Sequence, residues 1–469
     1  MNKLSEILRR IKNGTCEVVG LGRSNYALIN YLLELGAPRL IARDKGLPPS
    51  DTAQKYQKHE VIFKCGDGYL DGLHTEDCVI FRTPAIRPDI PEFLKAIEQG
   101  ALISSEIELY MMLTPSKLFC ITGSDGKTTT TTLIHLMLSK HAKAFIGGNI
   151  GISPLTHIKD NTAADLSVLE LSSFQLQGIS VSPDVAVLTN ITPNHLNWHI
   201  DMNEYISAKA DIIGERCREL VINADDTASL ELIQRIKPTA HITAFSLSKS
   251  REEILSLIPN AKACIYIENG TVIYCADTPE SVLNLTDIKL PGRHNVANYM
   301  AAIGATRAHV TNATVQSIAR TFGGVEHRLE FVAEKNGVKY YNSSIDSSPT
   351  RTVAALNALD CRPIVICGGS DKNVPFDTLA EALCARAKAV VLTGQTAERI
   401  RSAITSCPLY QTSDIKIINA PLFADAVQAA KDLAASGDTV LLSPACASFD
   451  AFKDFEHRGR TFKNIVLSF

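Results

Sequence analysis

The sequence predicts an α/β protein of three domains. Two observations support this prediction. Short β-branched runs alternate with longer helical patterns along most of the chain, which is typical of parallel sheets covered by helices. The chain also has 469 residues, and a single hydrophobic core stops growing at roughly 250–300 residues. We place the domains at residues 1–105, 106–324 and 325–469.

The first region has strand patterns in "CEVVG", "RLIARD" and "DCVIFRTP", with helical patterns between them. Gly20-x-Gly22 follows the first strand, and Asp44 ends the second, so we expect a Rossmann-like domain. Asn25 stands at the third glycine of the dinucleotide fingerprint. A tight strand-to-helix turn and a nicotinamide site both remain open. The latter would make the chain an NAD-dependent dehydrogenase, but no later segment supplies a hydride-transfer site.

The central region contains "LFCITGSDGKTTTTTLIHLML", an apolar strand, a glycine loop and a helix reaching about Lys140. Backbone N–H groups at such a helix start hold phosphates, Lys127 reaches the terminal phosphates, and Thr128 is placed to ligate Mg²⁺. Ile121 occupies the first glycine position of the usual phosphate loop, so the loop is predicted to be shorter. The alternative is an ordinary strand-to-helix turn.

The central region also departs from a purely parallel pattern. "ACIYIENGTVIYC" consists of two alternating runs around Asn269-Gly270, which predicts a β-hairpin. We therefore expect a P-loop ATPase-like domain of mixed α/β structure.

Three further residues are candidates for chemistry beside the loop. Glu170 ends the strand of "DLSVLELSSFQL", where a P-loop protein needs a carboxylate to organise Mg²⁺. His195 follows the next buried strand, in "DVAVLTNITPNHLNWH". Taken alone, His195 is more often a loop histidine than a metal ligand, and a lone helical lysine such as Lys209 is in most cases a solvated surface residue.

The last region returns to strands and helices, so we expect a C-terminal Rossmann-like α/β domain. Polar and glycine residues follow its strands at 342–346, 368–372, 394 and 443–448. Ligands of open parallel sheets bind beyond the carboxyl ends of strands, so this edge is a candidate second substrate site. The alternative is that these residues only form turns.

Composition excludes several classes of function. Lys plus Arg number 47 and Asp plus Glu number 50, with no long block of one sign. We therefore expect no duplex nucleic-acid surface and no polybasic membrane patch. The apolar runs are too short to span a bilayer, so we expect no membrane insertion. The twelve cysteines show no paired metal spacing and no signal peptide is apparent, so we expect reduced thiols and a cytoplasmic location.

These motifs, in their order along the whole chain, resemble the muramyl ligases of peptidoglycan synthesis, a family that includes folylpolyglutamate synthetase. The segments that carry the resemblance are "ITGSDGKTTTT", "GGNIG", "LELSSFQL", "NITPNHLNWH", "GRHNVANYMAA", "EHRLE" and "SPACASFDAFKDFEHRGRTF". "LELSSFQL" and the closing segment are most similar to the branch that joins D-glutamate to UDP-N-acetylmuramoyl-L-alanine. The resemblance implies an ATP-dependent amide-bond ligase with an acyl-phosphate intermediate, two Mg²⁺ ions and a monomeric state.

The resemblance also implies roles for individual residues. Lys127, Glu170, His195 and Lys209 would be catalytic, and Thr128, Glu170, His195 and Lys209 would hold metal, with Lys209 carbamylated. ATP would contact Gly123, Ser124, Asp125, Gly126, Lys127, Thr128, Thr129, Asn295, Asn298, Arg328 and Asp346. The other substrates would contact Gly22, Arg23, Ser24, Arg43, Asp44, Lys45, Asn149, Ser347, Lys372, Ser448 and Phe455.

Two departures from the family pattern concern the third region. Many such ligases read Asn-Asp-Ser-Lys-Ala-Thr where this chain has "NSSIDS", so Ser343 replaces the Asp and Ile345 the Lys. Asp346 is a candidate replacement for the lost carboxylate. In the phosphate loop, Asp125 stands where Asn is more usual.

Two other functions compete with this reading. A folylpolyglutamate synthetase belongs to the same class, but the uridine-type first domain argues against it. A non-catalytic nucleotide-binding regulator is the alternative from another class.

Overall fold

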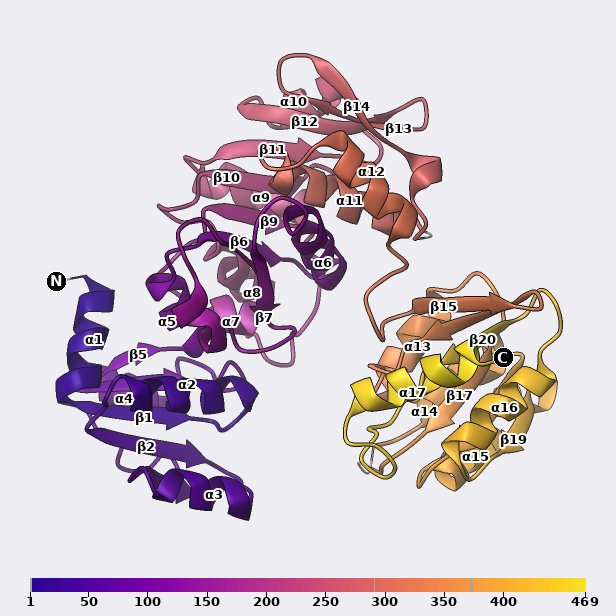
Figure 1. Ribbon diagram of the computed structural model, residues 1–469, viewed down its shortest axis with the longest axis horizontal. Helices are drawn as coiled ribbons and strands as arrows, with labels where there is room; N and C mark the ends of the chain where they lie inside the picture. Colours follow the sequence, from indigo (N-terminus) through magenta and orange to yellow (C-terminus); the bar gives the residue numbers. More distant parts are fainter. Residues whose placement is uncertain (1, 291, 372–373) are drawn as a thin grey trace. The chain divides into compact units, whose positions relative to one another are not determined.

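The computed structural model describes residues 2–290, 292–371 and 374–469. The chain forms two compact units, Met1–Thr321 and Phe322–Phe469. Figure 1 gives the labels of their helices and strands. Among the described residues, no helix combines the length and apolar composition that crossing a lipid bilayer requires.

The first unit begins with a five-stranded parallel sheet in the order β3-β2-β1-β4-β5. The strand order changes direction between β1 and β4, and open α/β sheets bind ligands beyond the carboxyl ends of the strands at such a switch point. The strands are β1 (Thr15–Val19), β2 (Arg39–Asp44), β3 (Ile62–Cys65), β4 (Cys78–Arg82) and β5 (Leu102–Ser104). The helices are α1 (Lys3–Asn13), α2 (Arg23–Glu34), α3 (Ser50–Gln57), α4 (Pro91–Glu98) and α5 (Glu106–Leu113).

The same unit contains a nine-stranded sheet in the order β14-β13-β12-β11-β10-β9-β6-β8-β7. Strands β7 to β12 with β6 are parallel, whereas β12, β13 and β14 pair antiparallel. The strands are β6 (Lys117–Thr122), β7 (Ala144–Gly148), β8 (Leu166–Glu170), β9 (Val185–Leu188), β10 (Glu219–Asn223), β11 (His241–Phe245), β12 (Ala261–Glu268), β13 (Thr271–Cys275) and β14 (Pro279–Asn284).

Helices cover this sheet, and α6 and α11 pack against one another, as Figure 1 shows. Side chains from both helices meet there, with Thr130 bonded to Asn298 and Thr306 bonded to Met137. The helices are α6 (Lys127–Leu138), η1 (Pro154–Asp160), α7 (Ser173–Leu176), α8 (Met202–Ala210), α9 (Thr227–Ile236), α10 (Arg251–Leu257), η2 (Leu285–Asp287), α11 (Arg293–Thr306) and α12 (Asn312–Thr321).

The second unit is built on a six-stranded sheet in the order β15-β16-β20-β17-β18-β19. All its pairs are parallel except β15 with β16. The strands are β15 (Glu330–Lys335), β16 (Val338–Asn342), β17 (Ile364–Gly368), β18 (Ala389–Thr393), β19 (Lys416–Asn419) and β20 (Thr439–Leu442). The helices are α13 (Pro349–Asn357), α14 (Asp377–Arg386), α15 (Ala397–Ser406), η3 (Pro408–Thr412), α16 (Phe423–Leu433) and α17 (Phe455–Leu467).

Buried strands divide their side chains between two hydrophobic layers. In β17, Val365 and Cys367 join one cluster of the second unit, and Ile364 and Ile366 join the other. This alternation follows from the two-residue period of a strand, and a parallel sheet covered on both faces is apolar on both.

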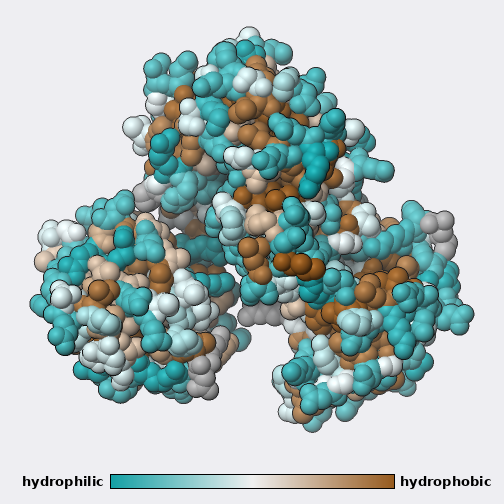
Figure 2. All heavy atoms as spheres, turned by 180° about the vertical axis from the view of Figure 1, so that it is seen from behind, coloured by the Kyte–Doolittle hydropathy of each residue, from teal (hydrophilic) through white to brown (hydrophobic). Residues whose placement is uncertain are grey.

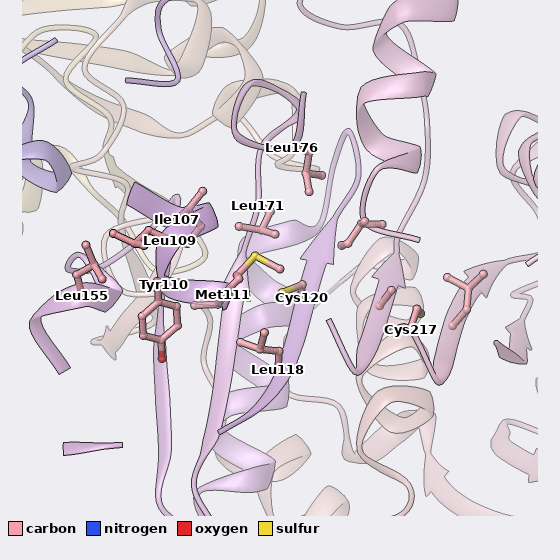
Figure 3. Close-up of a cluster of buried hydrophobic side chains, with 14 of the residues drawn as sticks. Ile107, Leu109, Tyr110, Met111, Leu118, Cys120, Leu155, Leu171, Leu176 and Cys217 are labelled. Carbon is pink, nitrogen blue, oxygen red and sulfur yellow. The ribbon is translucent and has the colours of Figure 1, made fainter. Parts of the chain in front are cut away.

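The core of the first unit includes side chains from α5 and β6, which Figure 3 shows with Met111, Leu118 and Cys120 among them. Figure 2 shows hydrophilic residues interspersed with hydrophobic groups on one face of the molecule. All twelve cysteines are free thiols.

The structure confirms the α/β class predicted from the sequence. The predicted hairpin is present, with β12 and β13 antiparallel and Glu268 opposite Thr271. No strand was predicted at β3, β5, β7, β10, β11, β14, β15 or β19. The three-domain borders stay a prediction.

Candidate active site

The phosphate loop connects β6 to α6 and is shorter than the usual one. Ile121 and Thr122 are still part of β6 and are fully buried, so the strand extends over the position of the missing glycine. Gly123 and Gly126 have φ angles of 151° and 77°, a region that glycine adopts without strain. The loop is therefore a tight glycine turn at the start of a helix, the geometry that favours phosphate oxygens.

A polar segment after β9 holds this loop in place. Thr189 Oγ1 donates to the carbonyl of Asp125 at 2.6 Å, and the backbone N–H of Asp125 donates to Asn190 Oδ1 at 2.9 Å. The Ser124 hydroxyl lies 2.9 Å from the Tyr205 hydroxyl. These contacts fix the loop backbone before any ligand arrives.

Asn298 packs directly against the loop. A side chain at Gly126 would place its Cβ 2.3 Å from Asn298 Oδ1, so only glycine fits there. Thr130 Oγ1 donates to Asn298 Oδ1 at 3.2 Å, and Asn298 donates to Asn295 Oδ1 at 3.1 Å. Both of the asparagines that the sequence assigned to ATP therefore lie beside the phosphate loop.

Lys127 begins α6 and folds back over the loop. Its Nζ donates to the carbonyl oxygens of Gly123 at 2.9 Å and Ser124 at 2.8 Å. The ammonium group is thus held over the glycine turn. Thr128, the next residue, is buried at the helix start, and Thr129 is half-buried.

Glu170 lies on the strand beside the loop. It ends β8, where it is paired with Ile121 of β6, two residues before Gly123. Its side chain is 2 % exposed. Asn149 Nδ2 donates to Oε1 at 2.7 Å, while Oε2 is buried and lacks a hydrogen-bond partner in the described part of the chain. A buried carboxylate oxygen without a donor is costly unless a cation or a ligand supplies one.

Lys209, in the last turn of α8, is 1 % exposed. Its Nζ donates to the carbonyl of Gly123 at 2.7 Å and lies 4.6 Å from the centre of the Tyr205 ring. Burial and then the charge of Lys127 lower the pKa of Lys209 to about 6. The amine is therefore neutral at pH 7, which the solvated-helix alternative did not predict.

His195 has a φ of 56° and packs edge-on against Phe174, with ring centres 4.9 Å apart. The residue is exposed, but partial desolvation of the imidazole lowers its pKa below the ordinary value, and the charges of Lys127 and Lys209 lower it further. These interactions place His195 near both lysines, as a neutral imidazole that retains a lone pair for a metal ion.

The first group of predicted substrate residues follows β1 and β2, at the carboxyl ends of these strands. Gly22 precedes α2, and Asp44 Oδ2 accepts from the backbone N–H of Leu21 at 2.6 Å. Ser24 is half-buried and Lys45 is exposed. The Asn25 side chain donates to the carbonyl of Gly20 at 2.6 Å, so it closes the turn where the dinucleotide fingerprint has its third glycine.

The Arg43 side chain is not free at this edge of the sheet. Its guanidinium is fully buried, pairs with Glu17 and donates to the carbonyl oxygens of Tyr69, Asp71 and Gly72 at 2.8–2.9 Å. Arg43 therefore holds the 69–72 loop, and any effect of it on a substrate would have to act through that loop.

In the second unit, Asp346 follows β16 and is buried. Its Oδ2 accepts from the Ser443 hydroxyl at 2.8 Å. Burial raises the pKa of Asp346 to about 6, against the opposing hydrogen bonds from Ser343 and Ser443. Arg328 is exposed, and its charge is among those that favour the Asp346 carboxylate.

Other predicted residues of the second unit also follow strands. Ser347 lies in the turn after β16, and Ser448 is buried in the loop after β20. Phe455 begins α17, with its ring edge-on to His327 at 6.0 Å. Lys372 lies outside the described residues.

Sequence reasoning missed the residues that support the site. Thr189, Asn190 and Tyr205 were not singled out, although all belong to segments that carried His195 or Lys209. Only their place in the sequence could have indicated them. A polar loop that follows a strand beside the phosphate loop is expected to contact the phosphate loop. Asn149 donates to Glu170 in this structure, and its predicted contact with substrate stays a prediction.

Comparisons with known proteins give the same family for the middle and C-terminal regions and for the whole chain. Residues 121–306 match the Mur ligase middle domain, and residues 327–446 match the Mur ligase, glutamate ligase domain. Two curated relatives are named UDP-N-acetylmuramoylalanine--D-glutamate ligase. The one from Acetivibrio thermocellus is 42% identical over 99% of both chains, and the one from Clostridium kluyveri is 45% identical over 96% of this chain and 95% of its own.

Solved structures share the fold at low identity. A UDP-N-acetylmuramoyl-L-alanyl-D-glutamate--2,6-diaminopimelate ligase is 16% identical, with a TM-score of 0.54 over 85% of this chain and 94% of its own. UDP-N-acetylmuramate-alanine ligase from Thermotoga maritima is 18% identical, with a TM-score of 0.52 over 97% of this chain and 99% of its own. With a phosphate loop of the expected form and relatives of this identity along its full length, the chain belongs to the Mur ligase family.

Proposed function

We propose that this ligase uses ATP to join D-glutamate to UDP-N-acetylmuramoyl-L-alanine in peptidoglycan precursor synthesis. The relatives at 42–45% identity carry the name of that activity. The observation in the structure that supports it best is the arrangement around Gly123. Lys127 and Lys209 both bond its carbonyl, and Glu170 ends the neighbouring strand.

The reaction has two steps. An oxygen of the muramoyl-alanine carboxylate attacks the γ-phosphorus of ATP, the bond to the β-phosphate oxygen breaks, and an acyl phosphate and ADP form. The D-glutamate amine then attacks the acyl carbon, phosphate leaves with the C–O electron pair, and the amine loses a proton. Activation is required because a carboxylate oxygen is a poor leaving group, whereas phosphate is a good one.

The phosphate loop would act in the first step. Backbone N–H groups at the start of α6 and the Lys127 ammonium would bind the phosphates and offset the charge that spreads over them in the transition state. Asn298, which adjoins Gly126, and Asn295, which accepts a hydrogen bond from Asn298, would help to hold this end of ATP. The family resemblance adds Arg328 and Asp346 to the residues that would contact ATP.

The residues present fit the magnesium that such chemistry uses. Glu170 Oε2 lacks a hydrogen-bond donor among the described residues, and a hard cation binds such oxygens. The neutral amine of Lys209 would react with CO₂, forming a carbamate and releasing a proton, which converts a nitrogen donor into an oxygen donor. Thr128, Glu170, His195 and the Lys209 carbamate would thus hold two ions. When bound, Mg²⁺ neutralises phosphate oxygens and orients them.

The other substrates would use the remaining predicted residues. Backbone N–H groups around Gly22 and Ser24 lie at the start of α2, where a nucleotide diphosphate is favoured, with Asp44 and Lys45 nearby. The Arg23 main chain lies in the same turn. D-glutamate would contact Ser347, Ser448 and Phe455, together with Lys372.

We also propose that the ligase works as a monomer in the cytoplasm. The free state of all twelve cysteines fits a reducing compartment, where ATP is also available. Analytical ultracentrifugation at working concentrations tests the first point, and fractionation of cells tests the second.

The decisive experiment is phosphate release with ATP, Mg²⁺ and UDP-N-acetylmuramoyl-L-alanine against a panel of D- and L-amino acids. Among the amino acids of the panel, only D-glutamate should give fast phosphate release. Mass spectrometry should identify the amide product. Release with a folate acceptor would instead support a folylpolyglutamate synthetase. A protein that binds NADH but does not bind ADP would support a dehydrogenase. A protein that binds ADP but shows no turnover would support a regulator.

A further inference from the structure

A cavity of about 310 Å³ lies within the second unit. The turn after β16 and the segments after β17 and β20 contribute to its wall, so it opens at the carboxyl ends of adjacent parallel strands. This is the edge at which open α/β sheets bind ligands. Its described lining residues are Ser347, Ser348, Arg351, Ser370, Val374, Phe376, Ala445 and Cys446. The wall is thus partly hydroxyl-bearing and partly apolar.

Arg351 is the one charged side chain among these described lining residues. It lies in the first turn of α13, which begins at Pro349. The turn before this helix has no cation of its own, because residues 342–348 read Asn-Ser-Ser-Ile-Asp-Ser-Ser. A negatively charged group entering the cavity would therefore meet Arg351 before any other described charge on its wall.

The Arg351 guanidinium is anchored to the turn before α13, and it keeps further hydrogen-bond donors for a ligand. Its Nη1 donates to the carbonyl of Ile345 at 3.0 Å, which is its one hydrogen bond within the described residues, and the side chain is exposed. A guanidinium carries five N–H donors, so most of the planar fork stays available for a carboxylate.

The helix start adds to the same preference for negative charge. The Ser348 side chain caps none of the backbone N–H groups of α13, so these groups keep a partial positive charge close to Arg351. Together the cavity, the cation and the uncapped helix start suit a small anionic ligand.

We propose that Arg351 binds one of the two carboxylates of the amino-acid substrate and so selects a dicarboxylic amino acid. The inference rests on the proposed function, which supplies D-glutamate as that substrate. The bond to Ile345 anchors the guanidinium at the wall of the cavity, and the remaining N–H donors have the planar geometry of a bidentate contact with a carboxylate.

The test compares Arg351→Gln and Arg351→Lys with the wild-type ligase by phosphate release. Arg351→Gln should raise the KM for D-glutamate by ~10- to 100-fold, since a charge-assisted hydrogen bond is lost. The KM values for ATP and UDP-N-acetylmuramoyl-L-alanine should change by less than about twofold, because these substrates do not use that side chain. Arg351→Lys should recover part of the loss, because lysine keeps the charge but not the fork.

Selectivity gives a second readout that a loss of stability would not produce. Wild-type ligase should prefer D-glutamate over D-glutamine and over D-isoglutamine, which carry an amide in place of one carboxylate or the other. Arg351→Gln should abolish the preference over whichever amide replaces the carboxylate that Arg351 contacts. Arg362→Gln is the matched control, since Arg362 precedes β17 at the opposite edge of the sheet and pairs with Asp414.

The outcomes separate this inference from the proposed function. An unaltered KM for D-glutamate and unaltered selectivity in both Arg351 variants would overturn the role of Arg351 alone. No phosphate release by the wild type with D-glutamate would overturn the proposed function itself. Circular dichroism checks the fold of each variant, and Arg351→Lys carries the test should Arg351→Gln fail to fold.

Discussion

Lys127 and Lys209 donate hydrogen bonds to the same acceptor, the carbonyl oxygen of Gly123, at 2.9 and 2.7 Å. Two ammonium groups this close repel one another, and Lys209 is the more deeply buried of the two. Its pKa is lowered to about 6 while Lys127 sits at the helix start facing the loop. Lys209 is therefore a neutral amine at pH 7, beside the lysine that we propose binds phosphate.

The first prediction concerns Lys127. Lys127→Ala should lower the rate of phosphate release by several orders of magnitude, each factor of ten being ~1.4 kcal/mol of barrier, because the transferred phosphoryl group loses its cation. Circular dichroism should be unchanged. Lys140→Ala, an exposed lysine just beyond the same helix, is the control. Turnover near that of the wild type in Lys127→Ala would remove Lys127 from the mechanism.

The second prediction concerns Glu170. Glu170→Gln keeps an oxygen for Asn149 but replaces the unpartnered Oε2 with an amide nitrogen, so the fold should survive. Turnover should fall about 100-fold or more, and half-maximal activity should need more Mg²⁺, because an amide is a poorer ligand than a carboxylate. A magnesium titration of activity measures both effects. Glu231→Gln, which changes an exposed glutamate, is the control. If Glu170→Gln gave the same magnesium titration curve as this control, Glu170 would not be a magnesium ligand.

The third prediction tests carbamylation of Lys209. Lys209→Ala should be inactive and should regain part of its activity in acetate or formate, which supply a carboxylate where the carbamate would lie. ¹³C-labelled bicarbonate should give a carbamate signal in the wild type and none in the variant. Full activity of Lys209→Ala without additives would show that Lys209 is an ordinary helix residue with no role in the reaction.

The fourth prediction follows from the pKa of Lys209. Between about pH 6 and 10.5 the unfolded state keeps a proton on this amine and the folded state does not, so its contribution to the free energy of unfolding rises with pH in that window. In CO₂-free buffer, wild-type stability should therefore increase relative to Lys209→Met between pH 6.5 and 9. Urea unfolding measures both proteins, and parallel pH profiles would show that the amine is not buried neutral.

The fifth prediction concerns Lys372, which the sequence assigns to the amino-acid substrate. Lys372→Ala should raise the KM for D-glutamate by ~10- to 100-fold with ATP binding nearly unchanged, since a charge-assisted hydrogen bond is lost. L-glutamate should be a poor substrate of the wild type, because inversion at the α-carbon misplaces the amine or a carboxylate. Lys416→Ala, an exposed lysine at the start of β19, is the control. An unchanged KM in Lys372→Ala, or equal use of L-glutamate, would refute this assignment.

Local sequence determined most of the fold and the chemical core of the site. The Asn269-Gly270 turn predicted the hairpin that the structure contains, because that dipeptide favours the required turn over any longer loop. Gly123, Gly126 and Lys127 predicted the phosphate loop, since glycine angles and a helix start are properties of neighbouring residues. The short strands β3 and β5 escaped prediction because they have few residues with which to show a period.

Tertiary structure alone decided what surrounds those residues. Asn298 lies on α11 and contacts Thr130, from which it is 168 residues away in the sequence. No local sequence pattern predicts such a contact. Arg43 became an internal support because Glu17 and three carbonyl groups meet it inside the domain. The neutral state of Lys209 likewise depends on burial and on the nearness of Lys127. Backbone preference and hydrophobic period act between neighbours in the sequence, whereas burial and charge act between neighbours in space, which only the path of the chain brings together.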